Sequence, residues 1–387
     1  MNKIIKSIEP IQITRGPKHH FFGYYDKHQW DETDRYILSN EVDFIDRSPG
    51  GDDQIILGMI DTQRDYEFIP LSSSKAWCWQ QGTMFQWIPG SKTRVIHNDR
   101  IGDRFVSIII DVETGKRKVL PRPIYTLSND GKKALSLNFS RLAITRPGYG
   151  YNGLRDWRIE QKHPDDDGIY IMDLESGDHK LIISLDEIVA IKHQDNMDDA
   201  IHWFNHLLFN PTNERFIFLH RWNTEDKKSF YTRLCTADIN GENIFVSDIL
   251  DGSHFIWYDN NHILIWARGY KGNAYYIIED ITDDIKIIGE GVLDRNGHCT
   301  VSPDGRWILT DEYPDAKGMR PLILFDIENN IRYDIGYFYS PPEFHGELRC
   351  DLHPRWNRAG NKVCIDSVHS GERQMYILDI GDIVKCT

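Results

Sequence analysis

Short stretches of alternating or continuous apolar residues recur along the chain, each bounded by a turn rich in Asp, Asn, Ser and Gly. One phrase is a turn followed by a strand, as in SNDGKKALSLN at 128 and SPDGRWILTDEY at 302. It occurs seven times, the other copies beginning near residues 31, 89, 210, 258 and 357. A second phrase places an acidic turn between two strands, as in IYIMDLESGDHKLI. Because Gly accepts positive φ and no long segment shows the period of a helix, the pattern predicts antiparallel hairpins.

The regular return of these phrases predicts an all-β fold, a seven-bladed β-propeller that forms a single domain over residues 1–387. A four-stranded blade cannot bury both of its faces alone, whereas blades packed around a ring can. We expect one short helical insertion, in SLDEIVAIKHQDNMDDAIHWFNHL at 184–207. The segment SLNFSRLAITRPGYGYNG at 136–153 is short and broken by glycines, so we expect a loop there that presents Arg141, Arg146, Tyr149 and Tyr151 together.

Composition narrows the function classes. Hydrophobic residues make up 40% and charged residues 27% of the 387 residues, which is typical of a soluble globular protein. The net charge of -14 argues against a nucleic-acid partner, which would require a basic surface. No apolar run is long enough for a membrane span or a secretory signal peptide. The six cysteines are scattered without CxxC spacing, which favours reduced thiols and a cytoplasmic location.

Ionisable residues gather where the repeated strands end, and in a propeller these ends converge on a central pocket. His298 precedes the sixth predicted blade, and Asp351 and His353 precede the seventh, so neighbouring blades could bring the three together. Two histidines and a carboxylate suit zinc or manganese, and Cys299 and Cys350 are possible further ligands that would favour zinc. The alternative is that the histidines cap turns by hydrogen bonding to the backbone.

A second group of residues is suited to binding a sugar. The motifs KHHFFGYYDKHQW and TRPGYGYNG offer aromatic rings and hydrogen-bond donors. The residues concerned are His20, Tyr24, Tyr25, Arg146, Tyr149 and Tyr151. The alternative is that the tyrosines seal the first blades against one another.

Several motifs together resemble a known family. They are HHFFGYYDKHQW at 19, LNFSRLAITRPGYGY at 137, HRW at 220, GHCTVSPDGRWILTDEYP at 297 and RCDLHPRW at 349. They look like the propeller-type polysaccharide lyases, namely the oligogalacturonate lyases and the propeller-type ulvan lyases. The resemblance implies β-elimination on a uronate-containing, acidic oligosaccharide, with a divalent metal bound in the later blades. Such a reaction needs a base for the C5 proton, a cation for the carboxylate and an acid for the leaving oxygen.

The resemblance also implies roles for individual residues. Arg221 matches the arginine that neutralises the uronate carboxylate, for which a guanidinium fork is well suited. A nearby histidine could be the base, since imidazole titrates near neutral pH, and we expect His206 before His202. Arg349, in RCDLHPRW, joins the predicted substrate-binding residues. The alternative is that the histidines of this strand pair are packed core groups.

The chain departs from the family at two places. The ulvan lyases carry a tyrosine where this chain has Asn205 and His206, so the acid is expected elsewhere. The oligogalacturonate lyases use a Gln and two close histidines where this chain has one His and an Asp.

Two other functions stay open from the sequence. One is a glycosyltransferase-like or sugar-recognising propeller in surface-polysaccharide biosynthesis, which the lack of a signal peptide motivates. The other is an interaction propeller without catalysis, which the crowding of His and Arg at strand ends disfavours. No P-loop, Rossmann turn, HExxH helix or GxSxG nucleophile motif occurs.

Overall fold

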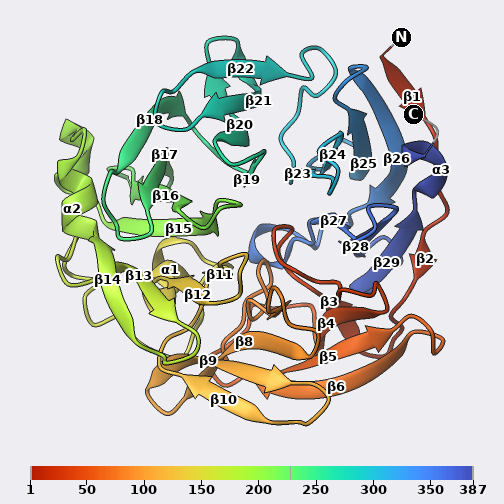
Figure 1. The fold of residues 1–387 in the computed structure, drawn as a ribbon, viewed down its shortest axis with the longest axis horizontal. Coiled ribbons are helices and arrows are strands. Elements are labelled where there is room, and N and C mark those ends of the chain that lie inside the picture. Colours follow the sequence, from red (N-terminus) through yellow and green to blue (C-terminus); the bar gives the residue numbers. More distant parts are fainter. Residues whose placement is uncertain (1, 227, 386–387) are drawn as a thin grey trace.

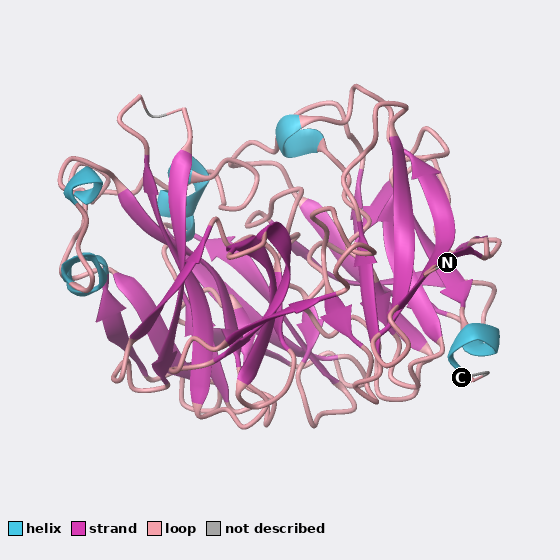
Figure 2. Cartoon of the chain, turned by 90° about the horizontal axis from the view of Figure 1, so that it is seen from above, coloured by secondary structure: helices cyan, strands magenta, loops and turns pink. Residues whose placement is uncertain are grey.

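The computed structural model describes residues 2–226 and 228–385. Antiparallel sheets stand side by side around a common centre, in sequence order (Figure 1). In sheets built from consecutive strands, the first strand lies nearest to the centre and the later strands follow outward, whereas the N-terminal strands lie at the outer edges of the last two sheets (Figure 1). Figure 2 shows the strands running between two faces that are covered by loops.

The first three sheets have four strands each. Their strands are β3 (His19–Phe21), β4 (Tyr36–Val42), β5 (Ile55–Asp61) and β6 (Glu67–Ser74); β7 (Gln86–Trp87), β8 (Arg94–Ile101), β9 (Arg104–Asp111) and β10 (Arg117–Leu120); and β11 (Thr126–Leu127), β12 (Lys133–Ser136), β13 (Gly168–Asp173) and β14 (His179–Ser184).

The next sheet has eight strands and consists of two halves. Between the halves, β18 pairs with β20 through one residue pair, Leu250 with Arg268. The first half contains β15 (His202–Phe209), β16 (Arg215–Asn223), β17 (Phe230–Asp238) and β18 (Phe245–Leu250). The second half contains β19 (Phe255–Trp257), β20 (His262–Gly269), β21 (Gly272–Glu279) and β22 (Ile285–Ile288).

The last two sheets combine both ends of the chain. One contains β23 (Thr300–Val301), β24 (Trp307–Asp311), β25 (Met319–Asp326), β26 (Ile331–Tyr339) and, in parallel at its edge, β1 (Lys3–Ile5). The other contains β27 (Arg355–Trp356), β28 (Lys362–Ser367), β29 (Gln374–Asp379) and the N-terminal β2 (Ile11–Gln12). The N-terminal segment therefore completes the C-terminal sheet and closes the ring.

The repeated turn closes in the same way in several sheets. Ser128 Oγ accepts a hydrogen bond from the Lys133 N–H, and Ser302 Oγ accepts one from the Trp307 N–H. Asn357 Oδ1 accepts from the Lys362 N–H at the equivalent turn. A short polar side chain that caps the turn backbone fixes where each second strand begins, which explains why the pattern is readable in the sequence.

The hydrophobic core lies between neighbouring sheets rather than within one. One large buried cluster includes Ile109, Leu135, Ile183 and Phe218, which come from β9, β12, β14 and β16. Another joins Leu324 of β25 to Ile365 of β28. Each sheet thus buries its faces only because it has neighbours on both sides.

Helices are few, and one of them, at residues 139–145, was not expected from the sequence. The segment expected to be only a loop begins with the helix α1 (Phe139–Thr145), which starts because the Asn138 side chain accepts from the Arg141 N–H. The expected insertion at 184–207 holds α2 (Leu185–Ala190) and the 3-10 helix η1 (Asp195–Met197), but residues from His202 onward belong to β15.

The remaining helical segments are η2 (Gly346–Leu348) and α3 (Gly381–Val384). In the described part of the chain, no helix is long and apolar enough to cross a membrane.

Candidate functional site

Two arginines without a carboxylate partner lie together near the centre of the ring. Arg221, on β16, donates from Nε to Thr232 Oγ1 at 3.1 Å, and its guanidinium lies 4.8 Å from the Phe230 ring. Arg146, just after α1, lies 5.0 Å from the same ring. Within residues 2–226 and 228–385, neither arginine forms an ion pair: Arg146 Nε has no hydrogen-bond partner, and the hydrogen bond of Arg221 goes to a threonine.

The positive charge of Arg221 is buried, which costs free energy. Its side chain is buried, with 8% of the residue exposed. Burial, followed by the positive charge of Arg146, lowers the pKa of Arg221 to about 10, so it is still protonated at neutral pH. Two neighbouring cations with no anion between them form a site that an anionic ligand would stabilise.

Tyr149 contacts both the arginine pair and Arg349. Its ring lies 4.8 Å from the Arg146 guanidinium, and its hydroxyl accepts a hydrogen bond from Arg349 Nη2 at 2.7 Å. Arg349 Nε in turn donates to Asp351 Oδ2 at 2.6 Å. The segment after α1 and the segment before β27 therefore meet at the centre, although about 200 residues separate them.

His298, Asp351 and His353 form a buried group in which the possible ligand atoms all lie within 4.8 Å of one another. The Nε2 atoms of both histidines are buried and have no hydrogen-bond partner in the described structure. The nearest Asp351 oxygen lies 3.8 Å from His298 Nε2 and 4.0 Å from His353 Nε2. Two unpartnered imidazole nitrogens facing one carboxylate fit a divalent metal.

The protonation states of the group also suit a metal. His298 Nδ1 lies 2.8 Å from Asp311 Oδ1, an arrangement that places the proton on Nδ1 and leaves the Nε2 lone pair free for a metal. Burial lowers the pKa of His353, which keeps it neutral. Burial alone would raise the pKa of Asp351, but the charges of Arg349 and Arg320 outweigh it, so the pKa is lowered and the carboxylate stays ionised.

The backbone in front of His298 is shaped for this contact. A Cβ on Gly297 would lie 1.6 Å from the Asp311 carbonyl oxygen, so no other residue fits there without a shift. This close approach lets the His298 N–H donate to Asp311 Oδ1 at 2.7 Å. The His298 ring is thereby fixed from both its backbone and its Nδ1.

Neither cysteine considered as a ligand belongs to this group. Cys299 Sγ faces the His254 carbonyl oxygen at 3.8 Å, and Cys350 packs in an apolar cluster with Phe344 and Val368. Burial raises the pKa of both thiols, that of Cys350 to about 11, so both stay protonated. The structure therefore gives no support to a sulfur ligand from either residue.

His206 is buried among aromatic side chains and lies close enough to Arg221 to feel its charge. Its ring stacks on Phe255 at 3.9 Å between centroids and meets the Tyr24 ring edge at 5.0 Å. Its Nε2 lies 3.3 Å from Asp26 Oδ2, and its Nδ1 is buried without a hydrogen-bond partner in the described structure. Burial is the main cause that lowers the pKa of His206, and Asp26 opposes it. The charge of Arg221 also lowers this pKa, so His206 and Arg221 lie close enough to interact electrostatically.

Three of the predicted site residues lie elsewhere. The two ring nitrogens of His202 are occupied, Nε2 by the Met197 carbonyl oxygen and Nδ1 by His220 Nε2. Tyr151 stacks on Phe139 at 4.3 Å and accepts from Asn98 Nδ2, with no exposed surface. The ring nitrogens of His20 contact Gln374 and Glu41. All three are bound within the walls of the ring.

Tyr25, expected from the sequence to contact the substrate, is buried against several histidine rings. Its hydroxyl donates to the Phe255 carbonyl oxygen, and its ring lies 5.4 Å from that of His298. The sequence reasoning missed His254, whose ring lies 4.0 Å from His298, and Arg320, whose Nη2 lies 2.8 Å from Asp351 Oδ1. Neither residue stands in a motif that distinguishes it from the many His and Arg residues of the strands.

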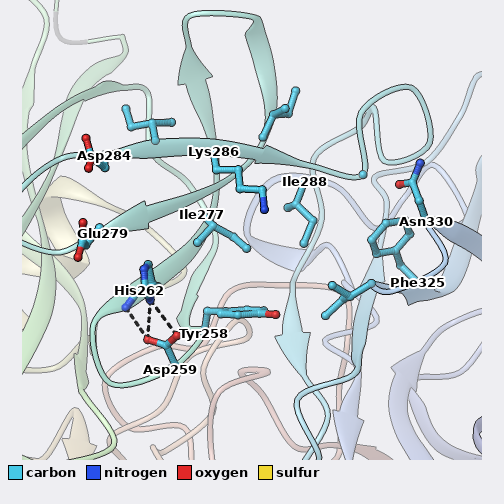
Figure 3. A pocket seen from close by; sticks show the side chains of 14 residues that line it. Tyr258, Asp259, His262, Ile277, Glu279, Asp284, Lys286, Ile288, Phe325 and Asn330 are labelled. Carbon is cyan, nitrogen blue, oxygen red and sulfur yellow. Dashed lines mark hydrogen bonds and ion pairs between the residues drawn. The ribbon is translucent and has the colours of Figure 1, made fainter.

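A separate pocket of about 540 Å³ opens beside β20 to β22 (Figure 3). Figure 3 shows Tyr258, Ile277, Ile288 and Phe325 around it, with His262 paired to Asp259 at its edge. None of the predicted site residues lines this pocket. Its chemistry is that of a partly apolar surface cleft with a hydrogen-bonded His–Asp pair at its edge.

Comparison with solved structures identifies the fold. An oligogalacturonate lyase in complex with manganese superposes with a TM-score of 0.67 and 12% identity, over 97% of this chain and 96% of that chain. An oligogalacturonate lyase from Vibrio parahaemolyticus gives a TM-score of 0.65 and 13% identity, over 97% and 95%. The fold is that of the oligogalacturonate lyases.

These neighbours confirm the expected propeller-type fold and the resemblance from which the site was predicted. A puromycin-hydrolysing peptidase from Mycobacterium tuberculosis also matches 97% of this chain, with a TM-score of 0.57 and 10% identity, but only 55% of its own length. No protein-family model and no curated protein matches the sequence. At such low identity the likeness establishes the fold, and the reaction has to be argued from the site.

Proposed function

We propose that this protein is a lyase that cleaves a uronate-containing oligosaccharide by β-elimination at the centre of the ring. The observation that carries the proposal is the pair Arg146 and Arg221, two buried or half-buried cations with no carboxylate partner in the described structure. A uronate carboxylate supplies the missing anion. A neutral sugar would leave both charges uncompensated.

In this proposal, Arg221 grips the carboxylate and Arg146 adds a second positive charge. Neutralising the carboxylate lowers the energy of the enolate that forms when the C5 proton leaves. His206 is the base, because its pKa is lowered by burial and it is therefore neutral and able to accept a proton at pH 7. The C4–O bond then breaks, the electron pair of the enolate forms the C4=C5 double bond, and the departing oxygen takes a proton from water.

Tyr149 and Arg349 complete the substrate-binding surface. Because the Tyr149 hydroxyl accepts from Arg349, its own proton is free to donate to a sugar oxygen. Tyr25 packs against the histidines rather than contacting the substrate.

His298, Asp351 and His353 would hold one divalent ion, zinc or manganese. The presence of manganese in one solved neighbour and the unpartnered Nε2 atoms of this chain support a metal here. Bound in this position, the ion would supply positive charge for a substrate oxygen. Arg320 and Arg349 keep Asp351 ionised and oriented for it.

The ring is best counted as seven blades. The two halves of the eight-stranded sheet share one residue pair, and each half has four strands, as do most of the other sheets. Dividing that sheet between β18 and β19 gives seven units that match the seven turn-and-strand phrases of the sequence.

The direct test is to incubate the purified protein with oligomers of several uronic acids and follow the ultraviolet absorbance of the unsaturated product. A rise in absorbance with at least one of them supports the lyase. If none is cleaved but one is bound, the site recognises an acidic sugar without cleaving it, and the lyase proposal is wrong.

A further inference from the structure

A buried chain of three charged or titratable groups lies beside the site, and the proposed reaction does not yet use two of them. Asp26 and Lys27 follow β3, and both side chains are buried. Lys27 Nζ lies 3.0 Å from Asp26 Oδ2, and the same oxygen lies 3.3 Å from His206 Nε2. The Asp26 and His206 side chains are 0% and 2% exposed.

Asp26 keeps its negative charge in spite of its burial. Burial would raise its pKa, but the charge of Lys27 and the hydrogen bond with His206 outweigh that effect and lower the pKa to about 2. An ionised carboxylate can only accept hydrogen bonds. The proton of the neutral His206 ring is therefore on Nε2, and Nδ1 carries the free lone pair.

The backbone at His206 is strained in a way that fixes the direction of the ring. His206 has a φ of 53°, in the left-handed region, and the pairing of β15 with β16 shifts register between Asn205 and Leu208. Such bulges re-aim side chains, and a non-glycine residue in this region costs free energy. The ring is then clamped by stacking on Phe255.

We infer that Asp26 is a positioning residue that fixes His206 in the Nε2–H tautomer, so that Nδ1 is the atom that accepts the substrate proton. When the C5 proton moves to Nδ1, the ring becomes an imidazolium whose Nε2–H still donates to Asp26. Asp26 is not protonated in this step, and its charge stabilises the imidazolium. Lys27 balances the charge of Asp26 in the resting protein. The inference rests on the proposed role of His206 as the base.

The state of the ring can be measured without any substrate. Long-range ¹H–¹⁵N spectra of the full chain with ¹⁵N-labelled histidine distinguish a protonated from an unprotonated ring nitrogen, and His206→Gln assigns the signal. The expected result at neutral pH is a protonated Nε2 and an unprotonated Nδ1. A His206 ring with its proton on Nδ1, or with both nitrogens protonated, would overturn the inference.

The kinetic test compares Asp26→Asn with a matched control. The Asn amide can donate as well as accept, so it no longer selects one tautomer. We expect kcat to fall by about 100-fold or more while KM changes little, in line with the cost of removing an orienting carboxylate. The control, Asp280→Asn, breaks the buried pair with Arg215 far from the centre and should lower stability without changing kcat.

The outcomes separate the two proposals. If the unchanged protein cleaves no acidic oligosaccharide, the proposed function fails, and the tautomer measurement still decides the role of Asp26. If the protein is active and Asp26→Asn retains its kcat, the positioning role is wrong and the lyase proposal stands. If Asp26→Asn does not fold, the spectra of the unchanged protein and of His206→Gln decide whether Asp26 selects the tautomer.

Discussion

Two buried arginines, Arg141 and Arg221, have nearly the same exposure and opposite surroundings. Arg141 is 1% exposed and uses its guanidinium fully, donating to Asp156 and to the carbonyl oxygens of His202, Arg158, Gln161 and Lys162. Arg221 is 8% exposed, yet its one hydrogen bond in the described structure goes to Thr232. Burial therefore does not distinguish these two arginines, whereas the completeness of their hydrogen bonds does, and our proposal gives the binding role to Arg221.

The histidines of the same strands show the same contrast. His220 receives a hydrogen bond from Arg233 Nε and contacts His202, whose other nitrogen faces Met197. Arg233 continues to the carbonyl oxygens at the end of α2, so this cluster anchors the helix. His206, on the same strand as His202, has a buried nitrogen with no partner in the described structure.

The largest effect is expected from Arg221→Lys. Lysine keeps the charge but loses the two-point grip on a carboxylate. We expect kcat/KM on the cleaved substrate to fall on the order of 100- to 1000-fold, with little change in the melting temperature. A variant that stays active but melts earlier would make Arg221 a structural residue and break the contrast with Arg141.

The converse is expected from Arg141→Met. The variant leaves Asp156 and several carbonyl oxygens without their buried partner, which typically costs about 3–5 kcal/mol of unfolding free energy. Urea denaturation measures this loss. The folded fraction should keep its kcat. A loss of kcat without a loss of stability would contradict the structural role of Arg141.

The two histidine clusters should differ in metal content. As purified, the protein should contain one equivalent of a divalent metal, and His298→Ala should reduce it to below about a tenth, since such sites bind strongly at neutral pH. The matched control, His220→Gln, should keep the metal. Elemental analysis of the unchanged protein and the two variants measures the metal content. If the unchanged protein contains no transition metal, the proposed metal site is wrong.

The smallest effect concerns pH. Burial lowers the pKa of His202 to about 4, against an ordinary value near 6.5. The unfolded chain therefore takes up a proton first as the pH falls, so the stability present above about pH 6.5 is lost towards pH 4. Between pH 6.5 and 5, the unfolding free energy of His202→Gln should fall by up to about 2 kcal/mol less than that of the unchanged protein. Urea denaturation midpoints at the two pH values measure this difference, and kcat should not change. If the variant lost activity instead, His202 would belong to the site.

The repeated turns made the fold readable, because each one is closed by its own Ser or Asn side chain. Helix α1 was not predicted because the glycines at 148 and 150 favour a loop, although the capping side chain of Asn138 was a usable signal. Nothing similar marks the bulge at His206. In a regular strand His202 and His206 would point to the same face, and the register shift after Asn205 separates them.

The centre of the site was predictable in part for the same reason. The motifs that contain Arg221, Tyr149 and the His298 group lie at strand ends, and the ring brings these ends together. Tyr151 and His20 come from the same motifs but contact the walls, since two residues of separation in a loop do not determine which way a side chain points. Asp26 is set apart only by its contacts with His206 and Lys27.

The central claim is that the unpaired arginines at the ring centre receive a uronate carboxylate. The most direct measurement is a crystal structure of the His206→Ala variant soaked with an acidic oligosaccharide, so that the substrate is held without being cleaved. We expect a carboxylate within hydrogen-bonding distance of Arg221 and close to Arg146, with the sugar next to Tyr149. An oligosaccharide bound elsewhere, with both guanidinium groups still without an anion, would contradict it.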